Sequence, residues 1–98
     1  MNQYNSKSNT VKQENVLIVE DSKLFSHTLY RSVKKELGFE AIICTSYSKT
    51  QEYLDQNPHD LFAALLDINL PDAPYGEIVD LVVGKGIPSI VITGQISD

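Results

Sequence analysis

Short runs of β-branched and other apolar residues alternate along this chain with segments whose apolar residues recur at helical spacing. This alternation limits the folds that the chain can adopt. Short apolar runs of this kind are typical of strands that are buried on both faces of a sheet. We identify four candidate strands, at residues 16–19, 40–44, 61–66 and 90–92.

The segments between these runs predict three helices. The first begins after a Ser22 cap and ends at Gly38, and its apolar row is Phe25, Leu29, Val33 and Leu37. The second covers residues 48–56. The third begins near Pro74 and carries the stripe Tyr75, Ile78, Val79, Val82 and Val83. Strands and helices that alternate in this way predict an α/β fold with a parallel sheet and helices on both of its faces.

Length and composition set the domain organisation. A chain of 98 residues is long enough for one hydrophobic core, so we expect a single domain over residues 15–98. Residues 1–14 consist mainly of Asn, Gln, Ser, Lys and Thr, which predicts a disordered N-terminal tail.

Several functional classes are disfavoured by the composition. The chain has 13 acidic and 8 basic residues, and a net charge of −5 argues against nucleic-acid binding through phosphate neutralisation. The single cysteine, Cys44, excludes an internal disulfide and a cysteine zinc site. No apolar stretch resembles a membrane span or a signal peptide. We therefore expect a cytoplasmic protein that contacts neither nucleic acid nor a membrane.

Polar residues whose side chains can bind ions or react follow three of the predicted strands. Glu20 and Asp21 follow the first strand, Asp67 the third and Thr93 the fourth. The carboxyl ends of parallel strands meet at one edge of the sheet, where ligands bind in such folds. Carboxylates crowded there repel one another unless a cation compensates, and oxygen ligands suit Mg²⁺. The sequence therefore predicts an acidic Mg²⁺ pocket with a hydroxyl group beside it.

Four motifs resemble the receiver domain of two-component response regulators. They are VLIVEDS at residues 16–22, PHDL at 58–61, LDINLP at 66–71 and PSIVITG at 88–94. Each motif alone is weak, but all four occur in the right order and at predicted strand ends. The resemblance covers residues 16–98 and implies the flavodoxin-like, doubly wound parallel sheet of that family.

The resemblance also implies a role for each matching residue. Asp67 would be the phosphoacceptor that attacks a phosphohistidine, and Thr93 would contact the phosphoryl group and act as the switch. Glu20, Asp21, Asp67 and the backbone carbonyl of Asn69 would bind Mg²⁺. The domain would be a signalling switch and not an enzyme. Its phosphodonor would be a sensor histidine kinase or a phosphotransfer protein, and an output domain would follow it in the parent protein.

Two features depart from the family pattern. The loop from Asp67 to Gly76 is one residue longer than usual, so we expect it to take a different path. The sequence ends at Asp98, whereas a receiver continues with a fourth helix, a fifth strand that carries a lysine, and a fifth helix. Lys85 cannot replace that lysine, because it precedes the fourth strand. We expect an incomplete receiver whose fourth strand is an exposed edge able to pair in a homodimer, or else a part of an intact receiver.

Two other functions fit parts of the pattern. A phosphohydrolase of the haloacid dehalogenase type also uses an aspartate after a strand, but it needs a second aspartate at the position of Asn69. A receiver-like interaction module that works without phosphorylation is the stronger alternative. Phosphorylation by small donors that is lost in Asp67→Asn would separate the switch from the module.

Overall fold

The computed structural model describes residues 15–57 and 61–92, and within them it shows one sheet of four parallel strands. The predicted α/β fold with a parallel sheet is confirmed. Residues 1–14, for which we predicted a disordered tail, and Thr93 lie outside the described residues. The elements follow the chain in the order β1 Asn15–Val19, α1 Lys23–Ser32, η1 Val33–Leu37, β2 Glu40–Cys44, α2 Tyr47–Gln56, β3 Leu61–Asp67, α3 Glu77–Val83 and β4 Ser89–Ile92.

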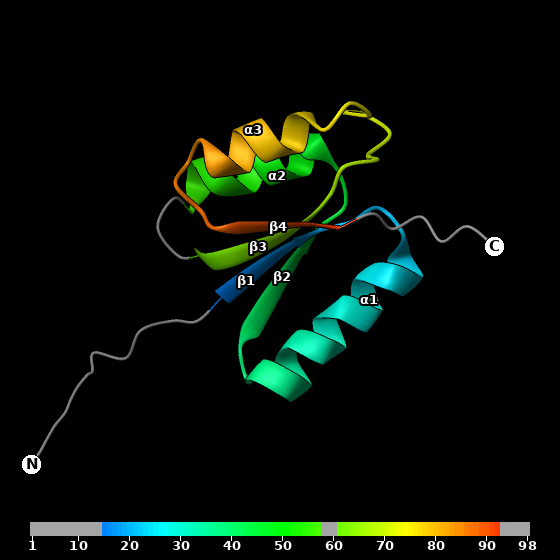
Figure 1. Cartoon of the computed structure of the whole chain (residues 1–98), viewed down its shortest axis with the longest axis vertical. Coiled ribbons are helices and arrows are strands. Elements are labelled where there is room, and N and C mark those ends of the chain that lie inside the picture. The colour runs from blue at the N-terminus through cyan, green and yellow to red at the C-terminus, as the bar shows by residue number, and fades with distance from the viewer. Residues whose placement is uncertain (1–14, 58–60, 93–98) are drawn as a thin grey trace, which may run out of the picture.

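The strands lie in the order β2-β1-β3-β4, with α2 and α3 on one face of the sheet and α1 on the other (Figure 1). The register brings the carboxyl ends of the strands together, since Val19 pairs with Cys44 on one side and with Leu66 on the other. Asp67 in turn pairs with Ile92. The carboxyl ends of all four strands therefore lie next to one another along the edge where we predicted the acidic pocket.

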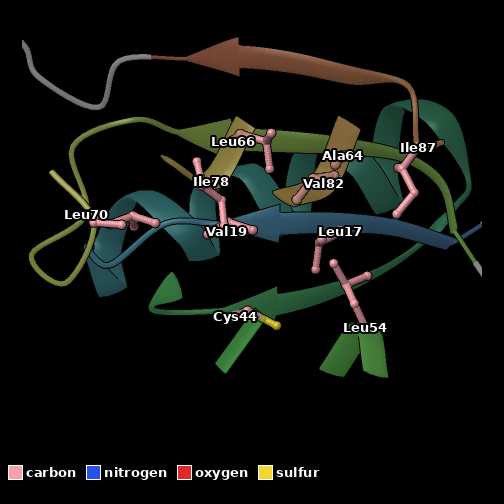
Figure 2. Packing of buried hydrophobic residues seen from close by; sticks show 11 residues of the cluster. Leu17, Val19, Cys44, Leu54, Ala64, Leu66, Leu70, Ile78, Val82 and Ile87 are labelled. Carbon is pink, nitrogen blue, oxygen red and sulfur yellow. The ribbon is translucent and has the colours of Figure 1, made fainter. Parts of the chain in front are cut away.

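Apolar side chains hold the layers together. They form two groups, one on each face of the sheet, because successive residues of a strand point to opposite faces. The larger group lies between the sheet and the α2–α3 layer, and Figure 2 shows most of its members. Its buried residues are Leu17, Val19, Cys44, Leu54, Ala64, Leu66, Leu70, Ala73, Ile78, Val82 and Ile87. The smaller group lies under α1 and η1 and has Val16, Ile18 and Val33 as its buried residues.

The first predicted helix changes geometry before it ends. Residues 33–37 form a π-helical turn, η1, which is wider than an α-helical turn. The wider turn moves Leu37 out of the row that buries Val33, and the Leu37 side chain is 57% exposed. Gly38 follows with a φ of 70°, in the left-handed conformation predicted for the end of this helix.

The third predicted helix is shorter than its apolar stripe indicated. Helix α3 begins at Glu77, so Pro74 and Tyr75 belong to the preceding loop, and the Tyr75 side chain is 89% exposed. The backbone N–H of Tyr75 donates a hydrogen bond of 2.8 Å to Glu77 Oε1, which favours a turn here over a helix, and Gly76 follows with a φ of 78°. The apolar face of α3 consists of Ile78 and Val82, with Val79 half-buried.

Strand β4 has β3 as its neighbour and forms an edge of the sheet among the described residues. The side chains of Ile90 and Val91 are 60% and 47% exposed. Across residues 15–57 and 61–92, no helix combines the length and the hydrophobicity that crossing a bilayer requires.

Candidate metal site at the carboxyl ends of the strands

Three carboxylates meet where β1 and β3 end. Glu20 and Asp21 follow β1 directly, and Asp67 is the last residue of the neighbouring strand β3. One carboxylate oxygen from each residue lies within 4.8 Å of the other two. Glu20 and Asp67 are both 2% exposed, whereas Asp21 is exposed, so the cluster is buried on one side and open to solvent on the other.

The two oxygens of the Glu20 carboxylate have different surroundings. Oε2 accepts a hydrogen bond of 2.9 Å from the backbone N–H of Ser22, which fixes the side chain under the start of α1. Oε1 is buried and has no hydrogen-bond partner among the described residues. A buried carboxylate oxygen without a donor is costly, and a cation is one way to satisfy it.

The pKa of the Glu20 carboxyl reflects these surroundings. It is raised from its ordinary value of 4.5 to about 7, mainly because burial disfavours the charged form. The Ser22 N–H lowers the pKa, while the neighbouring carboxylates of Asp67 and Asp21 raise it. A positive charge placed among the three acids would offset both the burial and the repulsion.

The backbone beyond β3 holds Asp67 in place. Asp67 Oδ1 accepts a hydrogen bond of 2.9 Å from the backbone N–H of Asn69, which forms a tight turn after the strand. Leu70 is fully buried, and its carbonyl accepts a hydrogen bond of 3.1 Å from the N–H of Ala73. The loop between β3 and α3 is therefore anchored in the core directly after the acidic cluster.

The donor set fits a divalent cation. Hard cations take carboxylate and carbonyl oxygens, and Mg²⁺ keeps several waters, which the open side at Asp21 allows. Three acids, two of them buried and one with an unpartnered oxygen, supply the negative charge that such an ion needs. These residues can hold a metal ion from the solvent side of the strand ends.

The sequence indicated Glu20, Asp21 and Asp67, and the structure brings these three together. Asn69 lies two residues beyond Asp67, next to the cluster, with its backbone N–H engaged by Asp67. Thr93 lies outside the described residues. The sequence reading missed Asp72, whose carboxylate binds the first turn of α2. Its partners are far away in the sequence, so no local motif could have identified it.

Comparisons with solved structures agree with this fold. No protein-family profile and no curated sequence matches the chain. Among solved structures, it is similar to a protein described as a two-component system response regulator with a GGDEF domain, with a TM-score of 0.71 and 30% identity over 88% of this chain. That similarity covers 34% of the other protein, so this chain spans about a third of its length.

A second similar structure is the bacteriophytochrome response regulator AtBRR. The TM-score is 0.70 at 21% identity, and the match covers 87% of this chain and 69% of that one. At this level of identity the likeness concerns the fold, which is a flavodoxin-like α/β fold. The parallel sheet, the strand order and these neighbours lead to one conclusion. The chain has a receiver-like fold, similar to that of these response-regulator structures.

Proposed function

We propose that Asp67 accepts a phosphoryl group from a sensor histidine kinase or a phosphotransfer protein, and that the domain acts as a Mg²⁺-dependent signalling switch. The observation that carries this proposal is the convergence of Glu20, Asp21 and Asp67 at the strand ends of a receiver fold. The buried Asp67 lies at the end of β3, and the exposed Asp21 marks the side from which a phosphodonor would approach it.

In the proposed reaction a carboxylate oxygen of Asp67 attacks the phosphorus atom of a phosphohistidine. The P–N bond breaks, its electron pair stays with the imidazole nitrogen, and Asp67 becomes an acyl phosphate. When bound, Mg²⁺ neutralises charge on the phosphoryl oxygens, which is the main requirement of phosphoryl transfer. Glu20, Asp21, Asp67 and the carbonyl of Asn69 would hold it.

The residues around Asp67 fix its geometry for this step. The Asn69 N–H holds one carboxylate oxygen and thereby sets the orientation of the side chain. The Ser22 N–H holds Glu20 at the same edge. Precise positioning of this kind is a large part of the catalysis of phosphoryl transfer. Thr93 would contact the phosphoryl group and report its presence to an output domain, in a cytoplasmic pathway.

Incubation with acetyl phosphate or phosphoramidate and Mg²⁺ tests the proposal. Intact-mass spectrometry should show a gain of one phosphoryl group, which EDTA and the Asp67→Asn substitution should each abolish. Asp80→Asn, which removes a carboxylate of an exposed residue on α3, is the matched control and should be phosphorylated normally. A gain of mass that persists in Asp67→Asn would assign the phosphoryl group to another residue.

The edge of β4 supports a second proposal, that two copies of the chain pair with each other. Ile90 and Val91 are largely exposed on a strand whose other side has no neighbour among the described residues. Exposed apolar edge strands pair readily with other strands. A chain that forms such dimers and shows no phosphoryl gain would instead be a phosphorylation-independent interaction module.

A further inference from the structure

The side chain of Asp72 connects the loop after Asp67 to the first turn of α2. Asp72 Oδ1 accepts a hydrogen bond of 2.9 Å from the backbone N–H of Tyr47, and Oδ2 accepts one of 3.0 Å from the N–H of Ser48. The yellow-green loop that carries Asp72 rises from β3 beside α2 and α3 (Figure 1). One carboxylate therefore bridges two segments, since Tyr47 and Ser48 lie 25 and 24 positions before Asp72 in the sequence.

The exposed carboxylate of Asp72 lies where a helix N-terminus favours a negative charge. The N-terminus of a helix has free N–H groups and a partial positive charge, and both favour a carboxylate. The two backbone hydrogen bonds hold the pKa of Asp72 below its ordinary value of 3.8, so the group is charged at neutral pH. Hydrogen bonds to an ionised acceptor are stronger than neutral ones.

Helix α2 does not depend on Asp72 alone for its start. Ser46 is its N-cap, and the Ser46 hydroxyl accepts a hydrogen bond of 3.0 Å from the N–H of Lys49. The hydroxyl of Thr50 also donates to the Ser46 carbonyl at 2.8 Å. Asp72 therefore adds a connection between the helix and the loop to a helix that already has a cap of its own.

The loop between Asp67 and Asp72 is short and fixed at both ends. Asn69 lies between them, with its N–H on Asp67 Oδ1 and with the fully buried Leu70 directly after it. The far end of this segment is tied to α2 by Asp72. Without the Asp72 bridge, the buried Leu70 and its hydrogen bond with Ala73 would still hold this segment, but the end next to α2 would be less constrained.

We propose that Asp72 is a positioning residue that holds Asn69 in place and thereby tunes the affinity of the acidic site for its cation. The second half of this statement rests on the proposed function, whereas the first half concerns the loop alone. Through this bridge the start of α2 helps to hold the loop that carries Asn69, although no residue of α2 belongs to the acidic cluster.

Asp72→Asn is the test variant, because an amide can accept only one of the two hydrogen bonds and carries no charge. Asp80→Asn is the matched control, since it removes the same charge from an exposed position outside the loop. NMR should measure the rates at which the amide protons of Tyr47, Ser48 and Asn69 exchange with water. Titration calorimetry should measure the affinity of each protein for Mg²⁺.

In Asp72→Asn we expect faster exchange at all three amides and a loss of Mg²⁺ affinity of about tenfold, which is typical when a residue that orients metal ligands is removed. Asp80→Asn should leave the Asn69 exchange rate unchanged. Faster exchange at Tyr47 and Ser48 without a change at Asn69 would make Asp72 a simple cap of α2 and would overturn the proposal.

The two proposals fail in different ways. A wild-type protein that binds no Mg²⁺ would contradict the proposed metal site, while the Asn69 exchange rates would still decide whether Asp72 positions the loop. A wild-type protein that binds Mg²⁺, together with an Asp72→Asn variant of equal affinity, would contradict the tuning role and leave the metal site intact.

Discussion

Glu20 and Asp67 lie side by side at the ends of two adjacent parallel strands, and both side chains are 2% exposed. The sheet forces this proximity, because the register of β1 and β3 sets Val19 against Leu66 and so brings the residues that follow them together. Burial raises the pKa of Glu20, and repulsion from the carboxylate of Asp67 adds to this effect.

The metal-free protein should lose stability as the pH rises from about 4.5 to about 7. Glu20 has a pKa of about 7 in the folded state and an ordinary value of 4.5 when it is free. Between these values the folded state binds more protons than the unfolded state, so the free energy of unfolding falls with rising pH. At 1.36 kcal/mol per pKa unit the loss has an upper limit between about 3 and 4 kcal/mol.

Urea unfolding in EDTA at pH 5 and pH 8 measures this loss. Glu20→Gln should remove most of the pH dependence in this window, because it removes the titrating group. The lowered pKa of Asp72 acts in the opposite direction but below this window, near and under its ordinary value of 3.8. Equal unfolding free energies at the two pH values would contradict a raised Glu20 pKa.

Replacement of Asp67 by Asn should stabilise the metal-free fold by about 1 kcal/mol at pH 8, since one of the two buried charges is removed. The Asn side chain keeps an oxygen that can accept the hydrogen bond from the Asn69 N–H. Asp80→Asn should change the free energy of unfolding by less than about 0.5 kcal/mol. A clear destabilisation in Asp67→Asn would show that Asp67 has a structural role that the cluster does not explain.

Millimolar Mg²⁺ should raise the melting temperature of the wild-type protein. A ligand that binds only the native state stabilises it by about 2.7 kcal/mol at a hundredfold excess over Kd. The increase should be larger at pH 8 than at pH 6, because protons on Glu20 compete with the cation. Differential scanning fluorimetry provides the measurement. An equal increase in a variant with both Glu20→Gln and Asp67→Asn would place the cation elsewhere.

The β4 edge should mediate self-association of the chain. Val91→Lys puts a charge on the exposed edge, and edge charges are a common protection against pairing. Size-exclusion chromatography with light scattering should show dimers of the wild-type protein and monomers of this variant. Leu24→Lys is the matched control, since Leu24 is 79% exposed on α1, a helix that packs mainly against β1 and β2. A wild-type monomer at high concentration would refute the pairing.

The parts of the fold that depend on local sequence patterns could be predicted. The short apolar runs gave the strands, and the polar residues directly after two of these runs indicated the acidic cluster. Leu37 and Tyr75 were expected on buried helix faces and are exposed, because a π-helical turn and the hydrogen bond from Tyr75 to Glu77 interrupt the helical period. Periodicity assumes a constant helical turn, so it could not reveal either change.

The role of Asp72 could not be predicted for a different reason. Its carboxylate caps a helix that precedes it by 24 residues, and this contact exists only once the sheet has placed α2 beside the β3–α3 loop. Aspartate in a loop next to Pro71 is ordinary turn chemistry in the sequence. Contacts of this kind follow from topology, and the sequence does not contain them in any local form.

Helix α1 packs mainly against β1 and β2, so it covers only one half of its face of the sheet. On the other half, Leu65 of β3 pairs with Ile90 of β4, and the Ile90 side chain is 60% exposed. Any chain that joins the sheet at β4 therefore meets two demands at once, because it has to supply backbone hydrogen bonds along the edge and an apolar surface over Ile90. A strand alone meets the first demand and a helix alone meets the second. A partner that offers both a strand and a packed apolar face would satisfy the β4 edge and cover Ile90 at the same time.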